Sequence, residues 1–183
     1  METGFGLNPL QLSENLPDDQ RPMAIEATLD AFLRMMAQFF GVTLDRMPRV
    51  IFIMTNLLRY LYHATDGPTF ADMYKMLLAM RDETEWRKLL SSLGVEEHEI
   101  AESLEYMREL PADAKLAVMN KIEPFVKNDV LRRIFCVRRS TVNVNKLLEP
   151  GKVVLWRLSL QGLQFLRTMI MSGVILRLWF SIL

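Results

Sequence analysis

The sequence has few of the residues that build cross-linked or metal-bound sites. Its 183 residues include one cysteine, Cys136, and two histidines, His63 and His98. A single cysteine excludes an internal disulfide framework and is compatible with a reducing compartment. So few sulfur and imidazole ligands argue against a structural zinc site. The first residues also lack the basic-then-apolar pattern of a secretory signal peptide.

Neither an overall charge nor a complete active site is present. Lys plus Arg equals Asp plus Glu at 22 each, so global charge does not indicate nucleic acid or membranes. The Gly-Phe-Gly at residues 4–6 is not a phosphate loop, because no Gly-Lys-Ser/Thr follows it and no strand precedes it. No nucleophile with a recognisable base and no metal cluster appears. We therefore predict no catalytic, cofactor-binding or metal-binding residue in this chain.

Strands are scarce, and helical periodicity dominates. Apolar residues recur every three or four positions from Met23 to Phe40, which predicts an amphipathic helix with Gly41 at its C-cap. The next helix runs to Tyr62, with Pro48 in its first turn and Asp45 as its cap. It is apolar nearly all round, so we expect it at the centre of a bundle.

Five further helices follow with short connections. Thr69 and Asp72 resemble a capping box for the first of them. Pro124 is expected to interrupt the helical pattern near the end of this region. The predicted ranges are Phe70–Met80, Glu83–Leu93, Glu96–Leu110, Ala112–Lys121 and Phe125–Phe135. The fold class is thus mainly α, a multi-helix bundle with antiparallel neighbours.

One buried strand is predicted, at Val153–Leu158, after the turn signal Pro150-Gly151. A lone strand leaves its backbone donors and acceptors without ladder partners, so the chain resembles part of a larger domain. The apolar stretch Leu163–Leu183 is expected to pack as a helix against the missing sheet. A membrane span is the alternative, although a span needs about 20 apolar residues.

Charge is unevenly distributed along the chain. Residues 82–113 hold ten acids and three bases, whereas residues 125–157 hold eight bases and two acids. One interpretation is two solvated faces that attract one another. The other is a basic strip for a phosphate backbone, carried by Arg132, Arg133, Arg138 and Arg139. If the helix breaks near Cys136, the later pair lies on a loop instead of on the same helix.

Two stretches carry a resemblance to a known group of proteins. They are GFGLNPLQL near the start and STVNVNKLLEPGKVVLWRLS near the end, followed by an apolar helix. Together they resemble segments of the HerA–FtsK-like motor ATPases, especially type IV secretion coupling proteins and related conjugation ATPases. In that group an Asn-Pro-Leu turn leaves a RecA-like core, a helical insertion follows, and a Gly-Lys-containing strand returns to the core.

The resemblance implies three parts: residues 1–22 leaving the core, residues 23–139 forming an all-α domain, and residues 140–183 returning to a RecA-like P-loop core. It implies a DNA-translocating ATPase that uses ATP and Mg²⁺, both bound outside this chain. It also implies a hexamer whose helical domain meets DNA or a protein substrate. The expected location is cytoplasmic, including the inner face of the membrane within a secretion complex.

Two alternatives come from other classes of protein. The thirteen methionines would suit a stand-alone adaptor that binds a partner helix in a Met-rich groove, or simply an adaptable core. A small helical protein anchored in a membrane by Leu163–Leu183 is the other alternative.

Overall fold

The computed structural model describes residues 6–13, 15–65, 67–92 and 98–141. In these ranges the regular structure is helical and no strand occurs, so the predicted all-α bundle is confirmed. The helices are α1 (Arg21–Phe39), α2 (Pro48–Ala64), α3 (Phe70–Ala79), α4 (Glu83–Ser92), α5 (His98–Glu109), α6 (Ala112–Lys127) and α7 (Asp129–Phe135), with short 3-10 helices at Asp18–Gln20 and Leu44–Arg46. The predicted strand Val153–Leu158 and helix Leu163–Leu183 lie outside the described residues.

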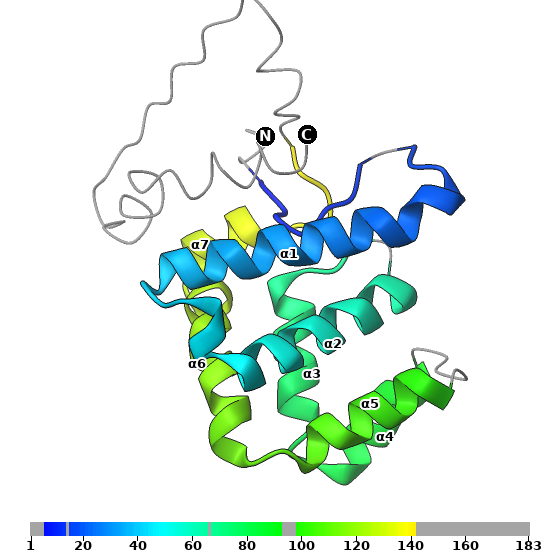
Figure 1. Ribbon diagram of the computed structural model, residues 1–183, viewed down its shortest axis with the longest axis vertical. Helices are drawn as coiled ribbons and strands as arrows, with labels where there is room; N and C mark the ends of the chain where they lie inside the picture. The colour runs from blue at the N-terminus through cyan, green and yellow to red at the C-terminus, as the bar shows by residue number, and fades with distance from the viewer. Residues whose placement is uncertain (1–5, 14, 66, 93–97, 142–183) are drawn as a thin grey trace, which may run out of the picture.

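Helix α2 occupies the centre of the bundle, as its all-round apolar sequence predicts. It contacts α1, α3, α5 and α6, and Figure 1 shows it between α1 above and the α4–α5 pair below. Ile53, Leu57 and Leu58 are completely buried within it. Burying each such side chain contributes about 1.5–3 kcal/mol. The packing of α2 therefore organises the domain.

A chain of four phenylalanines joins the helices around α2. Phe70 of α3 stacks on Phe125 of α6 with ring centroids 4.5 Å apart. Phe32 of α1 lies 5.7 Å from Phe70, and Phe135 of α7 meets Phe125 edge to face at 5.6 Å. Offset and edge-to-face pairs add about 0.5–1.5 kcal/mol each beyond area burial. Helices α1, α3, α6 and α7 thus share one aromatic core.

Two predicted helix boundaries are confirmed and one predicted cap is wrong. The Thr69–Asp72 capping box forms: the Thr69 amide donates to Asp72 Oδ2 at 3.0 Å, and the Asp72 amide donates to Thr69 Oγ1 at 3.3 Å. Gly41 follows α1 with φ of 63°, the left-handed conformation that glycine adopts without strain. Asp45 instead belongs to a 3-10 helix, and α2 begins at Pro48 without a side-chain cap.

The predicted interruption at Pro124 is also wrong, because α6 continues through it to Lys127. Proline in a helix interior removes one backbone hydrogen bond and costs about 3 kcal/mol. Ile122 and Phe125 flank Pro124, and their side chains are 0% and 1% exposed. Burial of both side chains outweighs the local cost, since each contributes about 1.5–3 kcal/mol. Tertiary packing therefore overrides the proline signal here.

The helix predicted at Phe125–Phe135 is shorter than expected and begins at Asp129. Asn128 is the reason. Its Oδ1 accepts hydrogen bonds from the amides of Val130 at 3.0 Å and Leu131 at 3.1 Å. These bonds satisfy two of the otherwise unpaired donors at a helix start. The cap therefore separates α7 from α6.

Among the described residues, no helix has the length and apolar character needed to cross a membrane. The segment for which a membrane span was the alternative, Leu163–Leu183, lies outside those residues.

Candidate functional site

The two ends of the described helical domain lie side by side. The Thr141 amide donates to the Gly6 carbonyl oxygen at 2.9 Å, and the Gly6 amide donates to Thr141 Oγ1 at 2.8 Å. The Asn8 amide donates to Ser140 Oγ at 2.9 Å. We call residues 6–16 and 136–141 the connecting segments. They meet on the face of the bundle near α1 and α7 (Figure 1).

The Asn8 side chain joins both connecting segments to the bundle. Its Nδ2 donates to the carbonyl oxygens of Pro68 and Arg138, each at 3.0 Å, and its Oδ1 accepts from the Leu10 amide at 3.0 Å. Asn8 is 4% exposed. Only a carboxamide offers two donors and an acceptor in this arrangement. We call these contacts the Asn8 clasp, and the sequence pattern does not predict this role of Asn8.

The four predicted arginines divide into two pairs, because α7 ends at Phe135. Arg132 and Arg133 lie in the last turn of α7, whereas Arg138 and Arg139 lie on the connecting segment beyond it. All four are exposed. The arrangement on a loop, expected if the helix breaks near Cys136, is therefore the one observed.

Arg132 and Arg138 form ion pairs with acids that lie outside the stretch 82–113. Arg132 Nη2 lies 3.4 Å from Asp129 Oδ1, and Arg138 Nη2 lies 3.5 Å from Asp72 Oδ1. Both arginine side chains remain more than half exposed. Exposed pairs of this length contribute about 1 kcal/mol or less. For Arg132 and Arg138, the ionic partners among the described residues are therefore Asp129 and Asp72.

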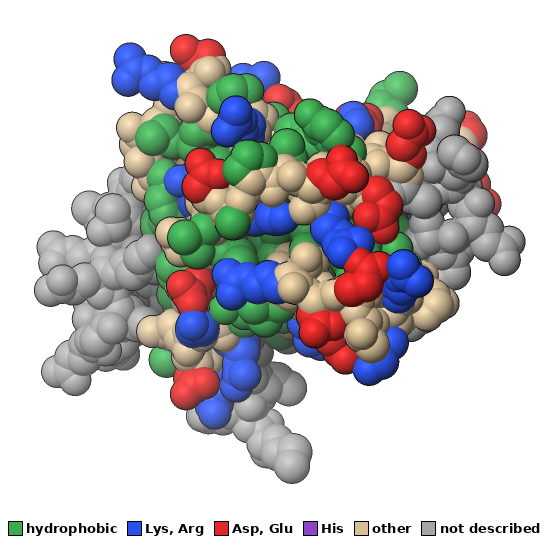
Figure 2. All heavy atoms as spheres, turned by 90° about the horizontal axis from the view of Figure 1, so that it is seen from below, with side chains coloured by type: hydrophobic (Ala, Val, Ile, Leu, Met, Phe, Trp, Pro, Cys, Tyr) green, Lys and Arg blue, Asp and Glu red, His purple; other side chains and the backbone are tan. Residues whose placement is uncertain are grey.

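The acidic helices α4 and α5 are instead held together by their own polar contacts. Glu83 accepts from Arg87 at 2.5 Å and also pairs with Arg108. Trp86 is fully buried, and its indole Nε1 donates to Glu105 Oε1 at 3.0 Å. Figure 2, which views the bundle from below, shows acidic and basic side chains next to each other on this face. The described part of the acidic stretch is therefore partly neutralised within the α4–α5 pair.

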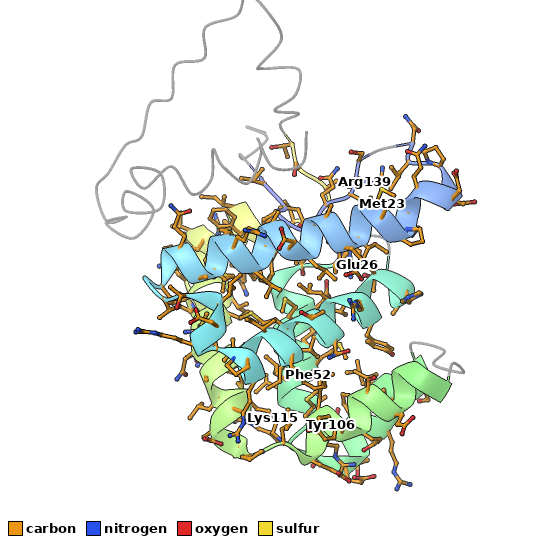
Figure 3. All side chains as sticks on the ribbon, viewed as in Figure 1. Met23, Glu26, Phe52, Tyr106, Lys115 and Arg139 are labelled. Carbon is orange, nitrogen blue, oxygen red and sulfur yellow. The ribbon has the colours of Figure 1, made fainter. Side chains whose placement is uncertain are left out.

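A polar pocket of about 370 Å³ lies between the connecting segments and the start of α1. Two of the predicted arginines, Arg138 and Arg139, line it together with Arg21, which the sequence analysis missed. Figure 3 shows Arg139 beside the N-terminal half of α1. The lining residues are Gln11, Leu12, Ser13, Asn15, Leu16, Arg21, Gly67, Arg138 and Arg139. We call this the arginine pocket.

Gly67 allows the backbone to close around the arginine pocket. It has φ of 86°, and a Cβ added there would lie 2.9 Å from the Arg138 carbonyl oxygen. Arg138 Nη1 also donates to the Gly67 carbonyl oxygen at 3.4 Å. A side chain at residue 67 would therefore push Arg138 away from the pocket.

Neither Cys136 nor Lys115 lines the arginine pocket. Burial raises the pKa of Cys136 to about 11, so its thiol stays protonated at neutral pH. Burial also lowers the pKa of Lys115, whose Nζ donates to the Arg108 carbonyl oxygen at 2.5 Å. Within the described ranges, no group of three or more potential metal ligands occurs. Three arginines line the pocket, so it is suited to binding an anion.

Comparison of the chain with protein-family models, curated proteins and solved structures finds no match in any of the three.

Proposed function

We propose that the helical bundle is the interaction domain of a DNA-translocating motor ATPase of the HerA–FtsK-like type, within the type IV secretion and conjugation group. The observation that carries this proposal is the pairing of Gly6 with Thr141. A domain inserted into a loop of another fold needs its two connections close together, as they are here. ATP, Mg²⁺ and the hexamer contacts would belong to the remainder of that motor.

In this role the bundle contacts the phosphate backbone of DNA through Arg132, Arg133, Arg138 and Arg139. Guanidinium groups match phosphate geometry and keep their charge at every physiological pH. All four side chains are exposed. Contacts of this kind position a protein on DNA without reading its sequence. Affinity for duplexes of different sequence should therefore be nearly equal.

Binding of the 183-residue chain to duplex DNA across salt concentrations tests the proposal. Four phosphate contacts predict a log–log salt slope of about −3.6. Replacing the four arginines with alanine should flatten the slope and weaken every duplex alike. The matched control replaces Arg34, Arg46, Arg49 and Arg87, which are equally exposed and remove the same charge. Equal slopes for the two quadruple variants would contradict the proposal, because net charge alone would then explain binding.

The genomic reading frame on both sides tests the motor itself. A Gly-Lys-Ser/Thr loop upstream and an acidic strand downstream are expected. The adaptor alternative has less support, because eight of the thirteen methionines are buried in the core and do not line a surface groove. They are Met35, Met36, Met54, Met73, Met76, Met80, Met107 and Met119.

A further inference from the structure

Three arginines from distant parts of the sequence line the arginine pocket. Arg21 is the first residue of α1, and Arg138 and Arg139 lie on the second connecting segment. Among the described residues that line the pocket, none is acidic. The sequence neighbours Glu14 and Asp66 lie outside the described residues. Positively charged side chains on several sides of one pocket attract an anion that enters it.

Arg21 and Arg138 retain most of their hydrogen-bonding capacity. Arg21 Nη2 donates to the Tyr62 carbonyl oxygen at 3.4 Å, and a guanidinium group has five N–H donors. Among the described residues, the Arg138 side chain makes long contacts to the Gly67 carbonyl oxygen and to Asp72 Oδ1, at 3.4 and 3.5 Å. Asp72 is already committed to the capping box, where its Oδ2 accepts from the Thr69 amide and hydroxyl. Short bidentate contacts to an oxyanion would be stronger than these long ones.

Neutral polar groups complete the lining. Ser13 and Asn15 contribute a hydroxyl and a carboxamide from the first connecting segment, beside Gln11. The Gln11 side-chain oxygen Oε1 accepts from the Ser140 amide at 2.6 Å, which leaves the side-chain nitrogen Nε2 as a donor. Ser, Asn and Gln are common phosphate-contacting residues beside arginine. The volume of about 370 Å³ exceeds that of one phosphate and admits part of the attached ligand.

We infer that the arginine pocket binds a phosphate group of a nucleotide, with Arg21 joining Arg138 and Arg139 as a phosphate ligand. The phosphate belongs either to a DNA backbone or to a free nucleotide, and the chemistry of recognition is the same. If the phosphate belongs to DNA, the inference rests on the proposed function. If it belongs to a free nucleotide, the inference is independent of that function. Arg132 and Arg133, which do not line the pocket, take no part in it.

Pyrophosphate binding to the 183-residue chain, measured by calorimetry at constant ionic strength, tests the pocket directly. Saturable binding is expected, and Arg21→Gln should weaken it about tenfold or more, the loss of a charge-assisted contact. Glutamine keeps a donor for the Tyr62 carbonyl oxygen, so the fold should be retained. Arg49→Gln, an exposed arginine outside the pocket, should change affinity by about twofold or less. Equal affinities for the two variants would overturn the inference.

Duplex DNA distinguishes the two sources of phosphate. If the DNA backbone fills the pocket, Arg21→Gln reduces the magnitude of the salt slope by about 0.9 and pyrophosphate competes with the duplex. If a free nucleotide fills it, Arg21→Gln weakens pyrophosphate and leaves the DNA slope unchanged. Either result supports a phosphate site. Loss of pyrophosphate binding in Arg132→Gln but not in Arg21→Gln would place the site elsewhere and overturn the inference.

The proposed function fails on a different result, namely equal salt slopes on duplex DNA for the quadruple arginine variant and its control.

Discussion

Two tyrosines on α2 allow the value of one buried hydrogen bond to be measured within a single helix. Tyr60 and Tyr62 are each 2% exposed. The Tyr62 hydroxyl donates to the Leu10 carbonyl oxygen at 2.7 Å, which joins α2 to the first connecting segment. The Tyr60 hydroxyl is buried and has no hydrogen-bond partner among the described residues. Replacing either tyrosine with phenylalanine removes one hydroxyl group from a buried side chain of α2.

The two substitutions should have opposite effects on the free energy of unfolding. Tyr62→Phe breaks a buried hydrogen bond and leaves the Leu10 carbonyl without that donor, which costs about 1–3 kcal/mol. Tyr60→Phe removes a hydroxyl whose burial is unfavourable, so the variant should be as stable as the parent or more stable by about 1 kcal/mol. The variants should therefore differ by about 1–4 kcal/mol.

Urea unfolding followed by circular dichroism at 222 nm measures this difference. With a slope of about 2 kcal/mol per molar urea, the two midpoints should lie about 0.5–2 M apart. The slopes themselves should match, because neither substitution changes the surface exposed on unfolding. Destabilisation of Tyr60→Phe by as much as Tyr62→Phe would refute the reasoning. The Tyr60 hydroxyl would then have a donor or acceptor that the described residues do not contain.

Three further predictions concern stability. Asn8→Asp replaces two donated hydrogen bonds with a carboxylate that faces carbonyl oxygens. Thermal unfolding should therefore show that the free energy of unfolding falls by about 2–4 kcal/mol. Asn120 is exposed, so the control Asn120→Asp should leave stability nearly unchanged. Thr69→Ala removes the capping contact to the Asp72 amide and should cost about 0.5–2 kcal/mol in the same assay. Burial raises the pKa of Tyr60 from 10.0 to about 12, so Tyr60 ionises at lower pH in the unfolded protein than in the folded protein. The free energy of unfolding should therefore fall as pH rises between these two values. Tyr60→Phe should lose part of that pH dependence.

Elements could be predicted from the sequence where neighbouring residues, such as caps and apolar positions, all indicate the same structure. In α2, the proline at the first helical position indicates where the helix begins, and the apolar residues on every side indicate that it is buried. The helix lies at the centre of the bundle. The Thr69–Asp72 box and Gly41 likewise act within a few residues of the helix ends that they define. Such signals need no knowledge of the tertiary structure.

The errors arise where a distant contact outweighs a local preference. Pro124 indicates a break, yet Phe125 stacks on Phe70, which is 55 positions away in sequence, and the helix continues. Asn128 caps α7, but an asparagine beside a proline-containing stretch predicts a loop equally well. The candidate site was found in part for the same reason. The arginines at 138 and 139 are conspicuous as a basic pair, whereas Arg21 joins them only through the fold.

The Asn8 clasp and the arginine pocket depend on the same stretch of backbone. The Arg138 carbonyl oxygen accepts from Asn8, while the Arg138 side chain lines the pocket. Gln11 also links the two connecting segments at the pocket, because its side chain accepts from the Ser140 amide and lines the pocket. Separation of the two connecting segments would therefore break these hydrogen bonds and displace pocket residues together. In the proposed motor, the connecting segments would join the bundle to the ATPase core. Movement of the core would then alter the position of the arginines, which gives a direct physical route from the core to the phosphate site.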